Sequence, residues 1–392
     1  MRRILYCFVT TYIGQRLFFK AAYSVILHKI ISMTHFFFLS VSKVQNLSPA
    51  AVAISFEIPE HLAAEFAFEA GQYITLKHTI HGKEVRRAYS ISSAPAASGP
   101  QKEFTVGIKE VKDGAFSTYA NRYIQVGDTL EVMPPQGRFL YKTQPTPTHL
   151  LGVAAGSGIT PILSIAETVL RNGPQHRFTL IYGNKTPGDS MFSKEIAALQ
   201  EQYPTQFKLQ WVFSQATESH AIFGRIDTAA IAYVLKNVDT EPFDGVYLCG
   251  PEPMIHAAKE TLMAQNISEE AIHYELFTTA SAKGQEGQEG QENKDATASG
   301  KIAVEVTVDG ERTTLEMDAK TILLDAIIKA DIDAPYSCQG GVCSSCICKV
   351  TEGSASMLKN QILTDPEIED GLVLSCQAMV TSPSIKVDFD DV

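Results

Sequence analysis

Short stretches in which apolar and polar residues alternate fill the first third of this 392-residue chain. Four of them lie at 52–56, 73–76, 104–108 and 130–133, and turn-forming residues separate them. Alternation with a period of two places every second side chain on the same face of a β-strand. The pattern therefore predicts an antiparallel β-barrel domain over residues 33–145.

The pattern changes over residues 146–278, where apolar strand-like stretches alternate with helical ones. This order is typical of an α/β doubly wound domain built on a parallel sheet. Residues 279–300 contain no large apolar side chain and repeat Gly-Gln-Glu in tandem, which predicts a flexible linker.

The last segment, residues 301–392, predicts a small α+β domain of the β-grasp type, so the chain is expected to be multidomain. Two alternating stretches, 302–308 and 312–317, flank Asp309-Gly310, a dipeptide that favours a hairpin turn. Thr321 is predicted to cap the helix that follows, which has apolar residues on one face.

Residues 1–32 carry five Lys or Arg and no Asp or Glu. Their longest charge-free run, 4–15, is much shorter than the roughly twenty apolar residues that cross a bilayer, so we expect no stable association with a membrane. Met33 begins a segment that resembles a natural N-terminus, and we interpret residues 1–32 as an N-terminal extension outside the native protein. An interfacial basic amphipathic helix is the alternative.

Composition is that of an ordinary soluble globular protein, with 45% hydrophobic and 20% charged residues. The net charge of −11 is concentrated after the linker, where residues 302–392 hold sixteen Asp or Glu and six Lys or Arg. An acidic surface repels nucleic acid and attracts a basic protein partner. A solvated acidic surface without a partner is the alternative.

Four cysteines after the linker have the spacing of a plant-type [2Fe-2S] site: Cys338, Cys343, Cys346 and Cys376. Zinc is the rival metal, but structural zinc sites usually contain two close cysteine pairs, and the second pair is missing. Cys348 could replace Cys346 as a ligand, although its strand-like surroundings favour a small buried thiol. The seven cysteines suggest no disulfide framework, which indicates a cytoplasmic location.

Two apolar strands end in glycine-containing turns that precede helices, an arrangement that binds phosphates at helix N-termini. The first turn contains Gly156, Gly158, Thr160 and Pro161, with Thr160 predicted as the helix cap and Pro161 as the first helical residue. The second is Gly250-Pro251. Either turn alone could be purely structural, but two such strand ends in one parallel sheet predict a dinucleotide cleft.

The barrel segment contains one polar set at a predicted strand end and another at the start of a short predicted helix: Arg87, Ala88, Tyr89 and Ser90, then Gly114, Ser117 and Thr118. Arg87 can bind a phosphate through its forked guanidinium, Tyr89 can stack on a flat ring, and Ser90 can offer a hydrogen bond to a ring nitrogen. A lone Tyr or Arg on a strand is usually a packing or surface residue, whereas the whole set favours a bound cofactor.

In these motifs the chain resembles the ferredoxin-NADP reductase superfamily, and the C-terminal ferredoxin segment makes it similar to the oxygenase-reductase branch. The resemblance covers about Met33 to the end. It rests on Gly71-Gln-Tyr73, Arg87-Ala-Tyr89-Ser90, Gly114-Ala-Phe-Ser117, Gly156-Ser-Gly158-Ile-Thr160-Pro161, Cys249-Gly250-Pro251 and Glu275-Leu-Phe277. It implies an enzyme that oxidises NAD(P)H and passes electrons through FAD and the [2Fe-2S] cluster to a separate oxygenase component.

The resemblance also implies residue roles. FAD would lie against the polar sets of the barrel, with Ser117 and Thr118 near its pyrophosphate and Phe277 near its flavin ring. The turns at 156–161 and 249–251 would place the nicotinamide, with Cys249 close to the hydride path. Ser90, Cys249 and Phe277 are therefore the candidate catalytic residues, although an inert core thiol is the alternative for Cys249.

The strand ends at 183–186 and 213–215 are where the resemblance places the reading of an adenosine 2′-phosphate. Gln215 stands where many NADPH-using relatives carry Arg, and no acidic residue favours NADH there. NADPH is the expected cofactor, with NADH less favoured.

Two alternative functions remain open. The acceptor could be a ring-hydroxylating dioxygenase or another monooxygenase. The chain could also be a non-catalytic ferredoxin-type module whose nucleotide cleft binds a regulator.

Overall fold

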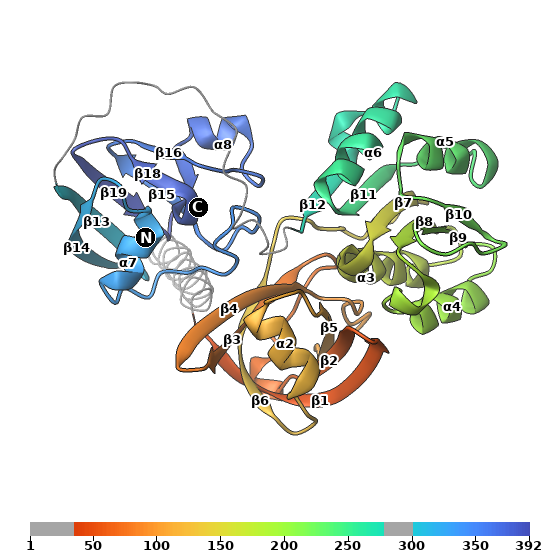
Figure 1. Ribbon diagram of the computed structural model, residues 1–392, viewed down its shortest axis with the longest axis horizontal. Helices are drawn as coiled ribbons and strands as arrows, with labels where there is room; N and C mark the ends of the chain where they lie inside the picture. Colours follow the sequence, from red (N-terminus) through yellow and green to blue (C-terminus); the bar gives the residue numbers. More distant parts are fainter. Residues whose placement is uncertain (1–34, 278–300) are drawn as a thin grey trace, which may run out of the picture.

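The computed structural model describes residues 35–277 and 301–392, and these residues form three sheet-based units (Figure 1). In this view the barrel lies below, with the C-terminal unit above it on the left and the parallel-sheet unit above it on the right. The predicted N-terminal extension and the whole of the predicted linker lie outside the described residues.

The first unit is the predicted antiparallel barrel. Its six strands run in the order β4-β3-β6-β1-β2-β5, and an Ile91–Val106 bridge joins the two ends of the sheet. Phe56, Phe66 and Phe104 are completely buried inside it and stack on one another. One helix, α2, covers the barrel. The elements are β1 (Phe37–Ser48), β2 (Ala51–Glu57), β3 (Tyr73–Ile80), β4 (Lys83–Ser90), β5 (Glu103–Lys109), α2 (Ala115–Arg122) and β6 (Thr129–Gln136).

The second unit is a parallel sheet in the order β10-β9-β8-β7-β11-β12. The order reverses at β7, which lies between β8 and β11, and ligands of doubly wound folds bind at such a switch point. The strands are β7 (His149–Ala155), β8 (Arg177–Asn184), β9 (Phe207–Phe213), β10 (Ala221–Phe223), β11 (Gly245–Gly250) and β12 (Ile272–Leu276). The helices are α3 (Ile159–Arg171), α4 (Ser193–Gln202), α5 (Thr228–Asn237) and α6 (Glu252–Ala264).

Helices cover both faces of this sheet, so its strands are apolar throughout. Along β7, Leu150 and Ala154 belong to the core shared with α3 and α4. Leu151 and Val153 belong to the core shared with α5 and α6. Burial on both faces explains why the sequence shows continuous apolar stretches here rather than alternation.

The third unit is a mixed five-stranded sheet in the order β14-β13-β19-β15-β17, with a small β16-β18 pair beside it. The predicted hairpin is confirmed: β13 pairs with β14, and Asp309 and Gly310 have φ values of 52° and 75°, as a type I′ turn requires. The elements are β13 (Lys301–Val308), β14 (Glu311–Asp318), α7 (Leu323–Lys329), β15 (Ile347–Glu352), β16 (Ala355–Met357), α8 (Asp365–Glu369), β17 (Leu372–Leu374), β18 (Ala378–Val380) and β19 (Ser384–Asp388).

The predicted cap of α7 is wrong. The amide of Thr321 donates to the carbonyl of Asp318 in the turn that follows β14, so the helix begins two residues later. Ile322 occupies the cap position, and no side chain caps the helix there.

None of the helices in the two described ranges is both long and apolar enough to cross a lipid bilayer.

Candidate functional site

Strand β4 presents different side chains to its two faces. Opposed residues of antiparallel strands point to the same side. Arg87 and Tyr89 lie opposite Leu76 and Ile74, which belong to the barrel core. Ser90 lies opposite Tyr73 on the other face, which is turned towards the neighbouring units.

The face that carries Arg87 and Tyr89 borders α2. The ring of Tyr89 packs 5.7 Å from that of Phe116 on this helix. Burial raises the pKa of Tyr89, so its hydroxyl stays protonated and remains a hydrogen-bond donor. Arg87 donates from Nη1 to the carbonyl of Arg86 at 2.7 Å, which leaves its other donors for a ligand.

The start of α2 is shaped by close contacts around Gly114. A Cβ at this position would lie 2.4 Å from a methyl group of Val111 and 2.5 Å from Oγ of Ser117, so a larger residue would displace the turn. Ser117 accepts a hydrogen bond from the Val111 amide, and Thr118 donates to Glu110. The turn that leads into the helix is therefore held by its own side chains.

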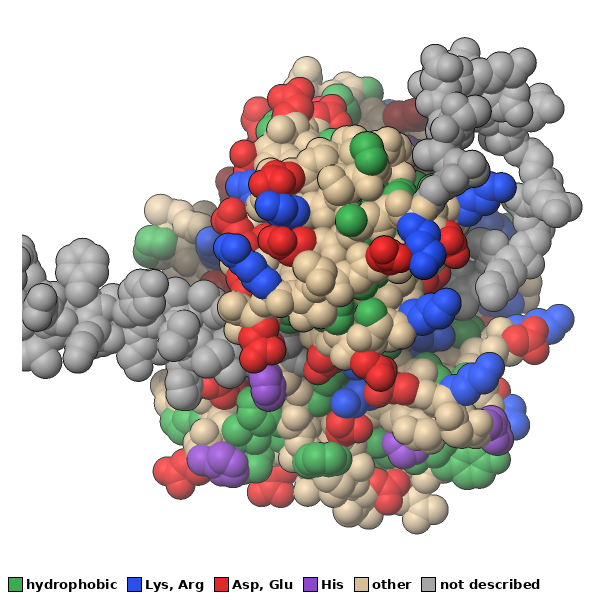
Figure 2. Space-filling model, turned by 90° about the vertical axis from the view of Figure 1, so that its left-hand side faces the viewer, with side chains coloured by type: hydrophobic (Ala, Val, Ile, Leu, Met, Phe, Trp, Pro, Cys, Tyr) green, Lys and Arg blue, Asp and Glu red, His purple; other side chains and the backbone are tan. Residues whose placement is uncertain are grey.

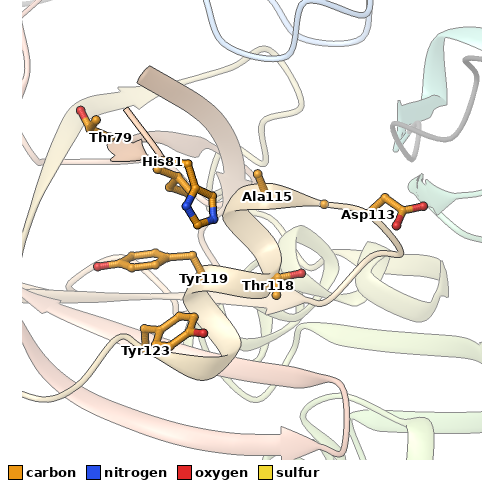
Figure 3. A pocket seen from close by; sticks show the side chains of 9 residues that line it. Thr79, His81, Asp113, Ala115, Thr118, Tyr119 and Tyr123 are labelled. Atoms are coloured by element: carbon orange, nitrogen blue, oxygen red, sulfur yellow. The ribbon is translucent and has the colours of Figure 1, made fainter. Parts of the chain in front are cut away.

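A cavity of about 480 Å³ opens between this helix start and the tip of the β3-β4 hairpin (Figure 3). Helix α2 lines it with Ala115, Thr118 and Tyr119, Tyr123 lines it just after the helix, and the hairpin contributes His81. Amides at a helix start favour an anionic group, and the tyrosines offer flat surfaces. The cavity suits the phosphates and an attached ring of a nucleotide.

In the parallel-sheet unit, the two predicted glycine turns touch each other. A Cβ on Gly158 would lie 2.1 Å from the carbonyl oxygen of Cys249, and one on Gly250 would lie 2.7 Å from Cε of Met254. Gly156 has φ +56°, in the left-handed region that glycine tolerates best. The ends of β7 and β11 thus meet at the switch point of the sheet.

The predicted cap at Thr160 is wrong. A short 3₁₀ turn, Gly156–Gly158, precedes α3, so the helix begins at Ile159 and no side chain caps it. The Thr160 hydroxyl donates to the carbonyl of Ser157 at 2.9 Å instead of accepting from an amide. Pro161 accordingly is the third residue of the helix, not the first.

A buried polar group joins the barrel to the parallel sheet. Ser90 donates to Oε2 of Glu275 at 3.4 Å, and Glu275 lies beside Cys249 because β12 pairs with β11 at these residues. Burial raises the pKa of Glu275 to about 8 and raises the pKa of the Cys249 thiol well above its usual value. Phe277 lies two residues after Glu275 and packs against the core that contains Cys249. The structure thus brings Ser90 and Cys249 next to Glu275, with Phe277 on the same stretch of chain.

One lysine lies beside the first glycine turn. Nζ of Lys109 lies 3.7 Å from the position of a Cβ on Gly156. Burial lowers the pKa of Lys109, while the charge of Asp189 raises it and the charge of Lys185 lowers it. The Gln215 amide donates to the carbonyl of Lys185 at 2.9 Å, which joins the two strand ends predicted to read a 2′-phosphate. Sequence reasoning missed Lys109.

In the C-terminal unit, the four predicted ligand cysteines come together. The thiol of Cys338 contacts those of Cys343 and Cys376, and Cys346 contacts Cys376. Hydrogen bonds with Cys343 and Cys376, and then with backbone amides, hold the pKa of Cys338 far below its usual value. Hydrogen bonds with Cys338, and burial, raise the pKa of Cys343 and of Cys376. The four thiols thus form one hydrogen-bonded group, and binding of iron would replace its protons.

The surroundings of these cysteines fit a two-iron cluster. A [2Fe-2S] cluster is bound by four thiolates, two on each iron, and four cysteines are present here. The amide of Gly340 points at Sγ of Cys338 at 3.3 Å, and the buried hydroxyl of Ser337 has no hydrogen-bond partner in the described residues, which leaves a donor for a sulfide.

The placement of Cys348 separates it from this group. Cys348 is completely buried on β15 in the main core of the unit, whereas Cys346 and Cys376 share a different core cluster. Burial raises the pKa of Cys348 well above its usual value. This favours Cys346 over Cys348 as the ligand.

Comparison with known proteins agrees with this division. The sequence matches the oxidoreductase FAD-binding domain over residues 39–141, the oxidoreductase NAD-binding domain over 153–260, and the 2Fe-2S iron-sulfur cluster binding domain over 306–381. It is 37% identical to a 1,2-phenylacetyl-CoA epoxidase subunit from Escherichia coli (strain K12), over 91% of this chain and 99% of that protein.

The chain belongs to the ferredoxin-NADP reductase superfamily, in the branch with a C-terminal [2Fe-2S] domain. A second relative is the 3-ketosteroid-9-alpha-monooxygenase ferredoxin reductase component of Rhodococcus rhodochrous, which is 33% identical over 90% of this chain and 96% of its own length. The fold is similar to that of phthalate dioxygenase reductase, with a TM-score of 0.56, 22% identity, and coverage of 90% of this chain and 98% of that one.

These findings confirm the predicted fold class and cofactor classes. The chain is an NAD(P)H oxidoreductase with an antiparallel flavin domain, a doubly wound nicotinamide domain and a ferredoxin domain, and its cofactors are FAD, a nicotinamide dinucleotide and a [2Fe-2S] cluster. The individual site residues and the choice of NADPH over NADH stay predictions.

Proposed function

We propose that this chain is the reductase component of a phenylacetyl-CoA epoxidase and supplies it with electrons from NADPH. The observation that carries the proposal is the meeting of three sites at one end of the barrel. Ser90 contacts Glu275 of the nicotinamide domain, and Tyr73, directly opposite Ser90, contacts the loop that holds the cluster ligands. The relative from Escherichia coli supports the choice of oxygenase.

In this proposal the residues of the barrel orient the flavin. Arg87 binds a phosphate of FAD, Tyr89 packs on its ring system, and the amides at the start of α2 face its pyrophosphate beside Ser117 and Thr118. The cavity next to α2 takes the adenosine half. When held by these residues, FAD would supply the conversion between a two-electron hydride donor and a one-electron acceptor.

The residues at the switch point position the nicotinamide. Gly158 allows the turn at the end of β7 to approach the Cys249 carbonyl, so the ends of β7 and β11 lie close together. Ser90, Glu275, the Cys249 thiol and Phe277 lie at this junction, where we expect the nicotinamide. The raised pKa of Glu275 keeps its carboxyl protonated near neutral pH, which avoids a negative charge beside the hydride path.

The proposal includes NADPH rather than NADH. Lys109 and Lys185 supply two positive charges near the glycine turn and the predicted 2′-phosphate position, where the sequence offers no acidic competitor except Asp189. A phosphate gains charge-assisted hydrogen bonds from such lysines. The proposal also includes a cytoplasmic location, because a reducing environment preserves thiolate ligands. The proposed domain limits are those predicted from the sequence.

The surface of the ferredoxin domain bears on how an oxygenase would bind. Figure 2 shows the side of the molecule that lies on the left in Figure 1. On this face, Asp and Glu side chains are interspersed with Lys and Arg. Several of these charges are paired, as in Lys349 with Asp370 and Lys386 with Glu352. An acidic excess with internal pairs steers a basic partner less strongly than an unbroken acidic patch would.

Two experiments test the proposal. Anaerobic addition of NADPH to the purified holoprotein should bleach the flavin and cluster absorbance together; an unchanged spectrum would contradict it and favour a non-catalytic binding module. Adding the oxygenase component of a phenylacetyl-CoA epoxidase should then give NADPH-dependent epoxidation. If a ring-hydroxylating dioxygenase or another monooxygenase turns over faster under the same conditions, the proposed partner is wrong.

A further inference from the structure

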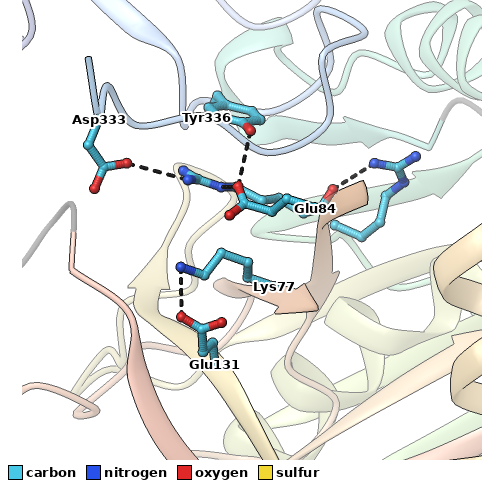
Figure 4. Close-up of polar contacts among 7 residues, drawn as sticks. Lys77, Glu84, Glu131, Asp333 and Tyr336 are labelled. Carbon is cyan, nitrogen blue, oxygen red and sulfur yellow. Dashed lines mark hydrogen bonds and ion pairs between the residues drawn. The ribbon is translucent and has the colours of Figure 1, made fainter. Parts of the chain in front are cut away.

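The ferredoxin domain rests on the barrel through side chains of β3, β4 and β6. Arg86 of β4 is only 8% exposed, and its guanidinium donates to Glu84 at 2.7 Å and to Asp333 of the ferredoxin domain at 3.4 Å. It also lies 4.2 Å from the centre of the Tyr336 ring, and the Tyr336 hydroxyl returns to Glu84 (Figure 4). Stacking and hydrogen bonding together make this the charged part of the contact. An ion pair between Arg138 and Glu367 adds to this charged part.

Tyr73, the first residue of β3, makes the uncharged part of the contact. Its hydroxyl lies 3.1 Å from Oγ of Ser344 and 2.9 Å from Oγ of Ser345. These serines lie between two predicted ligands, Cys343 and Cys346, within residues 338–346, the segment called the cluster loop from here on. The side chain of Tyr73 therefore reaches from the strand beside the flavin site into the loop that holds the iron.

The hydrogen-bond directions at Tyr73 are fixed by chemistry. Ser345 donates to Oε1 of Gln136 at 3.2 Å, since a carbonyl oxygen can only accept. With its proton used, Ser345 accepts from Tyr73, and Tyr73 in turn accepts from Ser344. These hydrogen bonds run from Ser344 to Tyr73, then to Ser345, and end at Gln136. Each of the three hydroxyl groups donates its one proton, and none of them lacks a partner.

The location of Tyr73 is set by the barrel itself. It pairs with Ser90 across β3 and β4, and its ring would be 3.0 Å from a Cβ on Gly137, so glycine there lets the ring lie flat against the chain. Tyr73 is 3% exposed, and its hydroxyl is bonded inside a domain contact rather than to water. A buried contact of this kind fixes distance more strictly than a surface ion pair does.

We propose that Tyr73 is a positioning residue that seats the cluster loop against the barrel and thereby sets the separation between flavin and cluster. The proposal rests on the proposed electron path. Electron tunnelling slows steeply as two redox centres separate. Two hydrogen bonds that hold the cluster loop against the barrel keep the cluster close to the flavin, so electron transfer is faster than with a loop that moves. Arg86 supplies binding between the domains, whereas Tyr73 acts on the segment that carries the iron ligands.

The test compares Tyr73→Phe with wild-type holoprotein. Phenylalanine keeps the ring and removes both hydrogen bonds, so the barrel still folds and packs. In anaerobic stopped-flow with NADPH, the flavin phase should keep its rate while the cluster phase slows by about tenfold, the effect expected from losing one to two such bonds. Ser345→Ala removes the hydroxyl that accepts the hydrogen bond from Tyr73, and it should slow the cluster phase as well.

A second measurement needs no substrate. Hydrogen exchange at amides 342–346 of the oxidised holoprotein should speed up by about tenfold in Tyr73→Phe, because the loop opens more often. Tyr233→Phe is the matched control: Tyr233 is exposed on α5 of the nicotinamide domain, and its variant should match wild type in both measurements.

Two results would overturn the proposal. One is wild-type exchange together with a wild-type cluster phase in Tyr73→Phe, which would make the contact dispensable. The other is equal slowing of both phases, which would assign Tyr73 to the flavin site. A wild-type protein that NADPH does not reduce would instead defeat the proposed function, and the exchange measurement would still decide the role of Tyr73.

Discussion

Oγ of Ser90 lies 3.4 Å from Oε2 of Glu275, although these residues belong to different domains and are 185 positions apart in the chain. Burial raises the pKa of Glu275 to about 8, and the bond from Ser90 partly offsets this rise. An acid whose pKa is raised by folding stabilises the folded state at low pH and loses that contribution as the pH rises through the folded pKa.

Glu275→Gln should therefore change how stability depends on pH. Between the ordinary carboxyl pKa of 4.5 and about 8, wild type increasingly loses stability from this group, whereas the amide does not ionise. Thermal unfolding of both holoproteins at pH 5.5 and pH 9 should show the variant gaining relative to wild type at the higher pH. A difference that stays constant across this range would contradict the raised pKa.

Cysteine substitutions should separate the ligands from the core thiol. Cys376→Ala removes a predicted ligand and should abolish the cluster, measured as bound iron and as the visible absorbance of the cluster. Cys348→Ala should retain both and lose about 1 kcal/mol of unfolding free energy, because it leaves a small void in a packed core. Loss of iron in Cys348→Ala with retention in Cys376→Ala would reverse the assignment.

Gly158→Ala should disturb the switch point. Its new methyl group would lie 2.1 Å from the Cys249 carbonyl oxygen, so the two strand ends must move apart. We expect a loss of about 3 kcal/mol in unfolding free energy and weaker binding of NADPH.

Gly188→Ala is the control for this substitution. The nearest atom to its added Cβ is Oγ1 of Thr186 at 3.8 Å, and its backbone conformation suits other residues. Denaturant unfolding should place this variant within about 0.5 kcal/mol of wild type. Equal loss in both variants would show that crowding at Gly158 is not the cause.

Lys185→Ala tests the preference for NADPH. Removing a charge-assisted contact with the 2′-phosphate should raise KM for NADPH by about tenfold and leave KM for NADH nearly unchanged. Steady-state reduction of ferricyanide measures both. Lys194→Ala, at an exposed lysine on α4, should change neither value. A parallel rise for both nucleotides would place Lys185 away from the 2′-phosphate.

Local chemistry explains which parts of the fold could be predicted from the sequence. Asp309 and Gly310 adopt the positive φ values of their turn because few other residue pairs tolerate them, so the hairpin could be predicted from two residues. The caps at Thr160 and Thr321 could not, because each depends on a preceding turn that shifts the helix start. Strand β1 contains irregularities between Val41 and Lys43 and near Ser48, which break the alternation that marks a strand.

The candidate site shows the same division. That the four candidate ligand cysteines come together could be predicted, because three of them lie within nine residues and the fourth lies on a segment that returns to them. Glu275 and Tyr73 occur in the motifs behind the family resemblance, yet no role could be assigned to either from the sequence. Glu275 matters because β12 lies beside β11, and Tyr73 because another domain rests on it. Lys109 was missed because a lone lysine at a strand end is ordinarily a solvated charge.

Strand β4 carries Arg86 towards the ferredoxin domain and Arg87 and Tyr89 towards the flavin side, on alternate faces of the same few residues. If Arg87 and Tyr89 bind FAD as proposed, the same short strand contacts both the cofactor and the ferredoxin domain. A chimaera in which residues 301–392 are exchanged for an unrelated ferredoxin would keep a barrel edge that is shaped for the original domain. Rapid electron transfer to the new cluster would then require redesign of this edge. That redesign would have to leave the adjacent Arg87 undisturbed.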